Sequence, residues 1–331
     1  MKMRRREFIA GLGSAVALPL AARAQQRPLP VIGALLGTSY PNFSDAGGAP
    51  TAAFRQGLGE QGYVEGRKVE ILYRFAEYQN DRLPELAADL VRHRVSAILT
   101  GGAPATLAAK KATATIPIVF FTGIDPVQAG FVASLNRPGG NATGAAYLSV
   151  ELDAKRLELV HEIAPAAKFI GYLYDPKYSA AYSEAEIKVL ETAARTLGLG
   201  LVTAEASTPS EIERAFAMLV GEGIGAFLYS TYLIPQRHQI IALAAHHALP
   251  AIYADRAMVE AGGLISYGGS VSDATHVAGT YVGRILKGEK PADLSVQQST
   301  RTEMAINLKT AKALRIEVPP KVLVLADQVI E

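Results

Sequence analysis

Hydrophobic and polar residues follow two alternating periodicities along most of this chain. Short continuous apolar runs, such as residues 30–36 (PVIGALL), are typical of strands that are buried on both faces of a sheet. Longer segments place apolar residues three or four positions apart, as in residues 82–94, where Asp81 is the predicted N-cap. Strands that alternate with helices in this way predict parallel sheets with helices on both faces.

The alternation extends from residue 30 to residue 286. Strands are predicted at residues 30–36, 68–75, 95–100, 117–121, 142–148, 168–174, 201–206, 226–230, 251–253 and 263–267. Helices are predicted at residues 49–61, 82–94, 104–114, 126–135, 151–163, 179–197, 209–220, 235–248 and 273–286. Similar numbers of strand–helix units therefore lie on each side of residue 149.

A strong breaker, residues 137–141 (RPGGN), interrupts the pattern in the middle of the chain. We therefore predict an α/β protein of two doubly wound parallel-sheet lobes joined by a hinge. A single (β/α) barrel is the main structural alternative, because it uses a similar number of units. The first lobe is expected to hold residues 28–148 and about 268–300, and the second lobe residues 149–267. The tail, residues 301–331, can dock on either lobe.

The first 24 residues have the pattern of a cleavable export signal. Basic residues precede an apolar stretch at residues 9–20, which is too short to span a bilayer. Ala22-Arg23-Ala24 presents small residues at the two A-x-A positions, so cleavage is expected before Gln25. Residues 5–9 (RREFI) resemble the twin-arginine signal. An amphipathic first helix is the alternative, but the charge gathers at one end and the apolar part has no polar face.

Removal of this segment changes the charge of the chain. The full sequence has a formal net charge of +2, but residues 1–24 contain five Lys/Arg and one acidic residue. The remainder then carries 28 Lys/Arg against 30 Asp/Glu. A surface so close to neutrality offers no electrostatic footprint for nucleic acid.

The absence of cysteine from the sequence excludes disulfides, thiolate catalysis, Cys-based zinc sites and a lipoprotein anchor. No second apolar run approaches the 18 residues of a membrane span. The mature protein is therefore expected to be a free, soluble monomer in the periplasm.

Spacings typical of catalytic sites are missing from the sequence. It contains no P-loop, no G-x-S-x-G elbow and no H-E-x-x-H among its six histidines. The first strand is followed by residues 37–40 (GTSY) rather than by a dinucleotide fingerprint. No catalytic residue, metal ligand or cofactor is predicted, and a binding protein is favoured over an exported α/β enzyme.

Small polar residues follow the predicted strands at their carboxyl ends, where open parallel sheets bind ligands. The hydroxyl and backbone N–H groups of residues 100–103 (TGGA) precede a helix and can hold a carboxylate. Asp175 and Asp255 can balance an ammonium group, with helix capping as the alternative for each.

Tyrosine is the second notable feature of these strand ends, because the chain has 14 Tyr and no Trp. Tyrosine combines apolar area with a hydroxyl, which suits a cleft for an organic ligand. Tyr172, Tyr229 and Tyr253 belong to this group. The predicted ligand-binding residues are Thr38, Ser39, Thr100, Gly101, Gly102, Ala103, Thr122, Gly123, Asp125, Tyr174, Tyr178, Ser230, Thr231, Asp255, Tyr267 and Gly268.

Several long segments resemble the ABC-transporter substrate-binding family of the tryptophan/tyrosine type. They are residues 116–127 (IPIVFFTGIDPV), 132–144 (VASLNRPGGNATG), 154–159 (AKRLEL), 259–264 (VEAGGL), 266–268 (SYG), 283–288 (GRILKG) and 306–312 (INLKTAK). The similarity covers essentially the whole chain after residue 24. It implies a type I periplasmic binding-protein fold, with an ABC permease and ATPase as partners.

The resemblance carries site residues over only to the loops at 100–103, 122–125 and 266–268, whereas Asp255 lies in a stretch that varies within the family. We expect a periplasmic solute-binding component of an ABC importer. Its expected ligand is a small amino-acid-like or aromatic carboxylate. A sensory receptor of the same fold and an exported enzyme are the alternatives.

Overall fold

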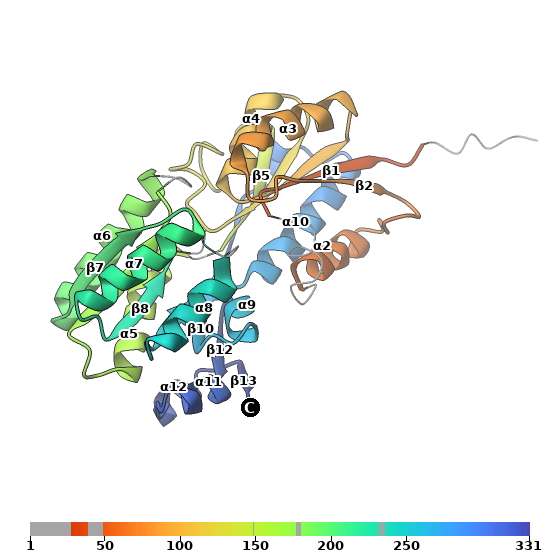
Figure 1. The fold of residues 1–331 in the computed structure, drawn as a ribbon. Coiled ribbons are helices and arrows are strands. Elements are labelled where there is room, and N and C mark those ends of the chain that lie inside the picture. The colour runs from red at the N-terminus through yellow and green to blue at the C-terminus, as the bar shows by residue number, and fades with distance from the viewer. Residues whose placement is uncertain (1–27, 39–48, 148, 177–179, 231–232, 234–235) are drawn as a thin grey trace, which may run out of the picture.

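The computed structural model describes residues 28–331 except 39–48, 148, 177–179, 231–232 and 234–235. The chain forms two α/β lobes, each built on its own sheet (Figure 1). This confirms the predicted fold class. The export signal and three predicted site residues, Ser39, Tyr178 and Thr231, lie outside the described residues.

The first lobe contains a parallel six-stranded sheet in the order β11-β5-β4-β3-β1-β2. Its strands are β1 (Val31–Leu36), β2 (Glu70–Phe75), β3 (Ala97–Gly101), β4 (Ile118–Thr122), β5 (Ala142–Tyr147) and β11 (Gln297–Ser299). One face is covered by α2 (Ala49–Glu60) and α10 (Val271–Leu286), and the other by α3 (Leu83–Arg92) and α4 (Ala103–Ala112). The continuous apolar runs of β1, β3 and β4 are buried because helices cover both faces.

The second lobe contains a seven-stranded sheet in the order β13-β12-β10-β9-β8-β6-β7. Its strands are β6 (Phe169–Tyr174), β7 (Gly200–Glu205), β8 (Ala226–Tyr229), β9 (Ala251–Tyr253), β10 (Ile265–Gly269), β12 (Thr302–Asn307) and β13 (Gln328–Ile330). Helices α5 (Asp153–Ile163), α6 (Ala180–Leu197), α11 (Leu308–Ala313) and α12 (Pro320–Leu323) pack on one face. The other face carries α7 (Pro209–Gly221), α8 (Arg237–His246) and α9 (Arg256–Glu260).

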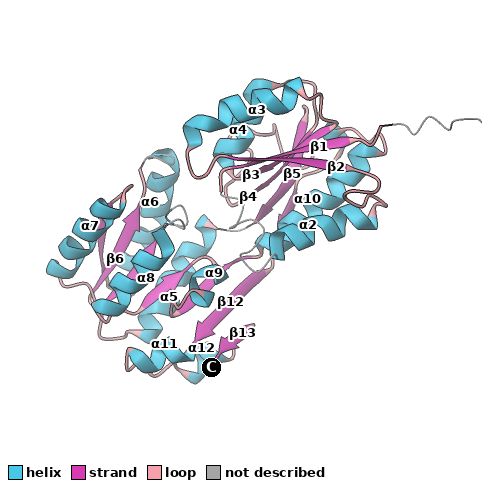
Figure 2. Ribbon diagram, turned by 45° about the vertical axis from the view of Figure 1, so that its right-hand side comes forward, coloured by secondary structure: helices cyan, strands magenta, loops and turns pink. Residues whose placement is uncertain are grey.

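Three short segments carry the chain between the two sheets. The first includes Ser149 after β5, the second is Ser270 between β10 and α10, and the third is residues 300–301 between β11 and β12. Helix α10 and strand β11 therefore pack with the first sheet, although they follow strands β6 to β10 of the second sheet in the sequence. The last 30 residues add β12 and β13 to the edge of the second sheet (Figure 2).

The return of the chain to the first lobe depends on close packing between α2 and α10, which lie side by side in Figures 1 and 2. A Cβ atom added at Gly57 on α2 would lie 2.1 Å from the carbonyl oxygen of His276. A Cβ atom at Gly279 on α10 would lie 2.1 Å from the carbonyl oxygen of Phe54. Two glycines therefore allow the two helix backbones to touch.

One predicted helix, at residues 126–135, is wrong. These residues form turns, in which the Asp125 carboxylate accepts hydrogen bonds from the N–H groups of Val127 and Gln128 at 2.7 and 3.2 Å. Gly130 has φ of 70°, which ends the turn after a few residues. One smaller correction concerns the start of α3. Asp81 lies inside a 3-10 turn, η1 (Asn80–Arg82), so Arg82 takes the N-cap of α3.

The second sheet is also not wholly parallel. Strand β12 pairs antiparallel with β10 because the third crossing returns the chain to this lobe at the carboxyl end of β10, where Thr302 lies opposite Gly269. Among the described residues, no helix is both long and apolar enough to cross a membrane.

Candidate functional site

Most predicted site residues of the first lobe lie at the ends of β3 and β4 or directly after them. Thr100 is fully buried, and its hydroxyl oxygen lies 2.9 Å from the hydroxyl oxygen of Thr106. Gly102 is the N-cap of α4, with φ of 80°, and its N–H donates to the carbonyl oxygen of Phe121. The Thr100 hydroxyl is thus engaged with Thr106 in the first turn of α4. The part of this loop that remains available to a ligand is the backbone that begins at Ala103.

Glycine is required at two of these strand ends because aromatic rings occupy the space of a side chain. A Cβ atom at Gly101 would lie 2.6 Å from the ring of Phe121. A Cβ atom at Gly123 would lie 2.9 Å from the ring of Tyr147 and 3.1 Å from Ser149. Gly123 therefore lets Tyr147, at the end of β5, lie against the loop after β4.

The other first-lobe candidates shape the same loops. The Thr122 side chain is buried and accepts a hydrogen bond from the N–H of Ile124 at 3.3 Å. Asp125 is exposed and caps the turn described above. The Thr38 hydroxyl donates to the hydroxyl of Tyr78 at 2.8 Å. For Asp125, capping is the role that the structure displays.

Asp255 follows β9 in the second lobe and caps α9, where one carboxylate oxygen accepts the N–H of Ala257 at 2.8 Å. Its position is fixed by close backbone packing, since a Cβ atom at Gly268 would lie 1.9 Å from the carbonyl oxygen of Ala254. Burial raises the pKa of Asp255, and the Ala257 N–H partly offsets that rise.

Two tyrosine hydroxyls lie within electrostatic reach of this carboxylate. Burial, and then the charge of Asp255, raise the pKa of Tyr147 to about 12, so the charge of a second-lobe acid acts on a first-lobe hydroxyl. Burial and Asp255 also raise the pKa of Tyr229 well above 10. Asp255, Tyr147 and Tyr229 thus bring polar groups of both lobes together.

Tyr229 is buried, with only 4% of its surface exposed. Even so, its hydroxyl has no hydrogen-bond partner among the described residues. Its ring packs edge-on against Tyr253, with centroids 5.4 Å apart. A buried hydroxyl without a partner costs free energy, and such groups mark places where a bound molecule or water completes the hydrogen bonding. Tyr147 was missed by the sequence reasoning, because only the fold shows that the charge of Asp255 acts on it.

A second polar cluster lies on the opposite face of the same sheet. The hydroxyls of Tyr172 and Ser230 donate to one carboxylate oxygen of Glu186 on α6, at 2.6 and 3.1 Å. All three side chains are buried, and burial followed by the charge of Asp153 raises the pKa of Glu186. Ser230, a predicted ligand contact, is therefore engaged with Glu186.

The remaining predicted tyrosines lie at the edge of this cluster. The ring of Tyr174 stacks on Tyr172 at 6.1 Å, and its hydroxyl donates to Glu205 at 2.7 Å. The carbonyl oxygen of Tyr267 accepts a hydrogen bond from Arg156 at 2.7 Å. Asp175 accepts a hydrogen bond from the Ser207 hydroxyl at 2.5 Å.

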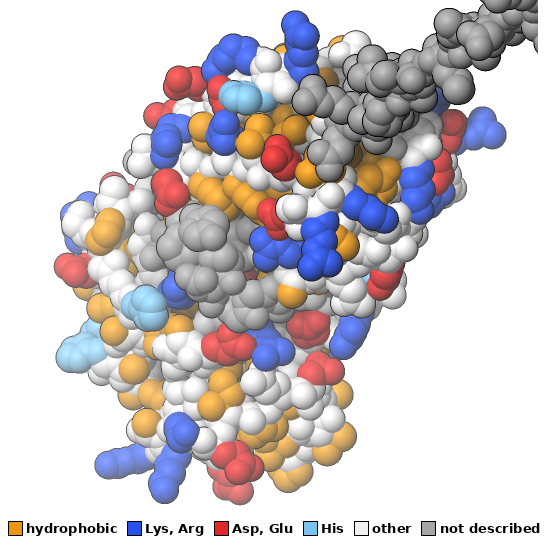
Figure 3. Space-filling model, turned by 90° about the vertical axis from the view of Figure 1, so that its right-hand side faces the viewer, with side chains coloured by type: hydrophobic (Ala, Val, Ile, Leu, Met, Phe, Trp, Pro, Cys, Tyr) orange, Lys and Arg blue, Asp and Glu red, His pale blue; other side chains and the backbone are white. Residues whose placement is uncertain are grey.

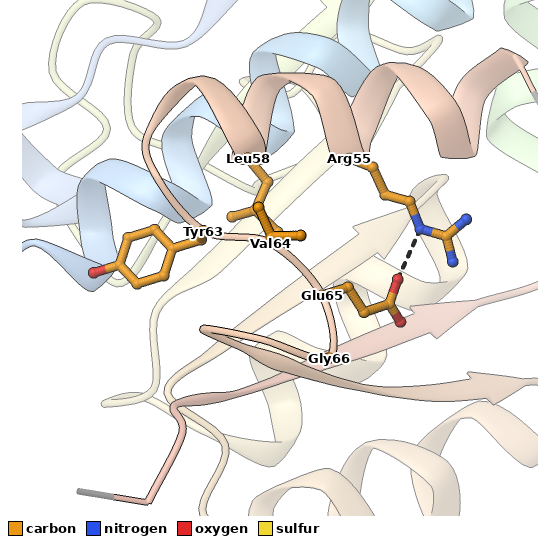
Figure 4. Close-up of a pocket in the computed structure, with 6 residues that line it drawn as sticks. All are labelled: Arg55, Leu58, Tyr63, Val64, Glu65 and Gly66. Carbon is orange, nitrogen blue, oxygen red and sulfur yellow. Dashed lines mark hydrogen bonds and ion pairs between the residues drawn. The ribbon is translucent and has the colours of Figure 1, made fainter. Parts of the chain in front are cut away.

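Open hollows on the outer surfaces of the lobes hold none of the predicted ligand contacts. One, of about 390 Å³, lies between the end of α2 and the following loop, where Arg55 and Glu65 form an ion pair at 2.7 Å (Figure 4). Another, of about 500 Å³, lies between α5 and α6. Basic and acidic side chains are interspersed on the face shown in Figure 3. Within the described part of the chain, no group of three His, Cys, Asp or Glu side chains is arranged to hold a metal.

Comparison with known proteins gives a consistent result. A profile of the family described as ABC transporter substrate binding protein matches residues 45–330. A tyrosine-binding protein of Clostridioides difficile is 31% identical over 266 residues, which cover 80% of this chain and 76% of that protein. Family and sequence relative thus agree over most of the chain.

Solved structures share the two-lobed fold. A domain from Streptococcus pneumoniae in complex with L-Trp has a TM-score of 0.81 at 26% identity, and covers 91% of this chain and 100% of its own. A ligand-free, open substrate-binding protein from Clostridium difficile has a TM-score of 0.65 at 27% identity, and covers 91% of this chain and 99% of its own. With its profile match and this shared fold, the chain belongs to the ABC transporter substrate-binding protein family, the solute-binding components of ABC transporters.

Proposed function

We propose that this protein binds an aromatic amino acid, or a related small carboxylate, between its two lobes and presents it to an importer. The observation that carries the proposal is the group formed by Asp255, Tyr147 and the unpartnered hydroxyl of Tyr229. Relatives support the aromatic ligand, since one is named a tyrosine-binding protein and another was solved with L-Trp.

The chemistry of the group suits the polar end of an amino acid. The Asp255 carboxylate attracts an ammonium group, and the Tyr229 hydroxyl supplies an unused hydrogen bond beside it. The start of α4 at Ala103 offers backbone amides to a ligand carboxylate. Tyr174 is the last residue of β6, so it is proposed to reach the apolar part of the ligand from the carboxyl edge of the sheet.

The same geometry suggests how binding changes the protein. A ligand that touches both lobes stabilises the closed arrangement over the open one by its differential affinity for the two. At nearly equal identity and coverage, this structure matches the L-Trp complex better than the ligand-free, open relative. We infer that the lobes lie here nearer to the ligand-bound arrangement.

Calorimetry against the twenty amino acids and aromatic acids tests the ligand class. Heat of binding is expected with L-tyrosine or L-tryptophan, and heat with sugars or amides alone would contradict the proposal. Asp255→Asn is expected to weaken binding by about tenfold to a hundredfold, the range of a hydrogen bond to a charged group. The matched control is Asp293→Asn, because Asp293 is an exposed acid in the short 3-10 turn η4 (Pro291–Asp293) and is not among the predicted ligand contacts.

The setting of the protein is part of the proposal. Substrate-binding proteins of ABC transporters work outside the cytoplasm, and the export signal at residues 1–24 fits delivery to the periplasm. An ABC permease and ATPase are the proposed partners of a monomeric receptor. Co-purification of the folded protein with the permease, strengthened by added L-tyrosine or L-tryptophan, tests this assignment.

A further inference from the structure

The three crossings between the lobes are tied to one another by hydrogen bonds on the second-lobe side. At the second crossing, the Ser270 N–H donates to the carbonyl oxygen of Arg301 in the third crossing at 2.9 Å. The Ser270 hydroxyl also donates to the Glu303 carboxylate at 2.5 Å. The second and third crossings therefore form one unit, to which the first crossing has to be joined separately.

Arg156 on α5 makes that junction. Its Nη2 donates to the carbonyl oxygen of Ser149, in the first crossing, at 3.2 Å. Its Nε donates to the carbonyl oxygen of Tyr267, three residues before Ser270, at 2.7 Å. Nη1 is paired with the carboxylate of Asp153. One guanidinium thus spans the two places at which the chain first enters and then leaves the second lobe.

The burial of this guanidinium makes its geometry restrictive. Arg156 is 4% exposed, so its hydrogen bonds are not exchanged with water. A guanidinium offers donors in a rigid planar fork, and it can satisfy both carbonyl oxygens only when they hold one relative position. Arg156 contacts the hinge backbone directly through hydrogen bonds, whereas it acts on Tyr229, on the other face of the sheet, only through its charge, which Arg156→Lys keeps.

We propose that Arg156 is a positioning residue that fixes the first two crossings relative to each other, so that the lobes move as rigid bodies about Ser149, Ser270 and residues 300–301. Its effect on affinity rests on the proposed function, but its effect on lobe geometry does not. Without the guanidinium, the crossings shift independently and the ligand-free protein samples more arrangements of the lobes. Only a fraction of these can bind, which lowers the apparent affinity by that fraction.

The experiment measures the distance between the lobes in the full mature chain. Because the sequence has no cysteine, nitroxide labels can be placed specifically at Leu107→Cys on α4 and Met218→Cys on α7, both exposed residues. Arg156→Lys keeps the charge but loses the fork. The ligand-free distance distribution is expected to broaden, and the affinity for L-tyrosine or L-tryptophan to fall by about tenfold.

Two controls separate this effect from instability and from loss of any ion pair. Phe216→Leu lowers the melting temperature from within the core of the second lobe, away from the crossings. Arg284→Lys makes the same chemical change in an exposed pair with Glu289. Both variants are expected to keep the narrow distribution.

A second variant keeps the proposal testable if Arg156→Lys fails to fold. Asp153→Asn removes the carboxylate that aligns the guanidinium but leaves both carbonyl contacts, and it is expected to give a smaller broadening. Distributions of wild-type width in every folded variant of Arg156 or Asp153 would overturn the proposal, as would equal broadening in Phe216→Leu. Broadening without binding of either amino acid would uphold the hinge and contradict the proposed ligand.

Discussion

Two glycines on one turn of α2 give a sharp test of how the first lobe is assembled. Gly57 faces α10, where an added Cβ atom would lie 2.1 Å from the carbonyl oxygen of His276 and 2.9 Å from the N atom of Thr280. Gly59, two residues along the same helix, has nothing within 4 Å of an added Cβ atom. The same Gly→Ala change therefore meets backbone at one position and open space at the other.

The two substitutions are expected to have opposite effects on stability. At Gly59, alanine removes the low helix propensity of glycine, so Gly59→Ala is expected to stabilise by up to about 1 kcal/mol. At Gly57, the obstructing atoms are main-chain atoms and cannot turn aside, so α2 and α10 have to move apart. Overpacking of this kind costs about 1–3 kcal/mol. Gly57→Ala is therefore expected to destabilise despite the gain in propensity.

Thermal and urea unfolding of the two variants measure the difference. A change of 1 kcal/mol shifts the melting temperature by about 2–4 °C for a domain of 150–250 residues. The variants should therefore differ by several degrees in opposite directions from the wild type. A neutral or stabilising Gly57→Ala would show that α10 does not pack on α2 as the structure has it. The same result would contradict the position of the second crossing, which leads into α10.

Three further outcomes are expected. Tyr229→Phe removes a buried hydroxyl without a partner, so it should leave the melting temperature of the free protein unchanged or raised while weakening ligand binding; equal loss of both would contradict its role. Burial raises the pKa of Glu186 above its usual 4.5, so its contribution to stability is complete below that pH and is lost as the pH rises. In Glu186→Gln, urea unfolding should show a smaller decline in stability above pH 4.5. Replacement of Arg5 and Arg6 by lysine should block export of the folded protein, and continued efficient secretion would indicate the general secretory path.

The order of strands and helices could be predicted from periodicity because burial on both faces leaves a strong apolar signal. The helix at 126–135 failed because Asp125 captures nearby N–H groups and Gly130 ends the turn, which are local effects that periodicity does not register. Helix α9 spans five residues, too few to show a period. The edge strand β13 was missed because it has only three residues, none of them fully buried.

The sequence predicts which strand ends form the candidate site, but it does not predict the contacts that their side chains make. Strand-end reasoning placed Asp255 where both lobes approach, because the carboxyl ends of parallel strands share one edge. It could not show that the Thr100 hydroxyl turns to Thr106, since that depends on the first turn of α4. Nor could strand-end reasoning predict that the charge of Asp255 acts on Tyr147, because the two residues belong to different lobes.

The hinge shows most clearly why sequence patterns leave function partly hidden. Asp153 and Arg156 are charged residues in an amphipathic helix, and by periodicity both are expected at the surface, yet both are buried. Burying an ion pair is often no more stabilising than apolar packing of the same volume, so stability alone does not explain their position. Apolar contacts are non-directional and let segments slide, whereas hydrogen bonds from one guanidinium to two carbonyl oxygens define a single geometry. Buried charge beside the crossings is therefore the expected solution for a protein whose lobes have to move without losing their register.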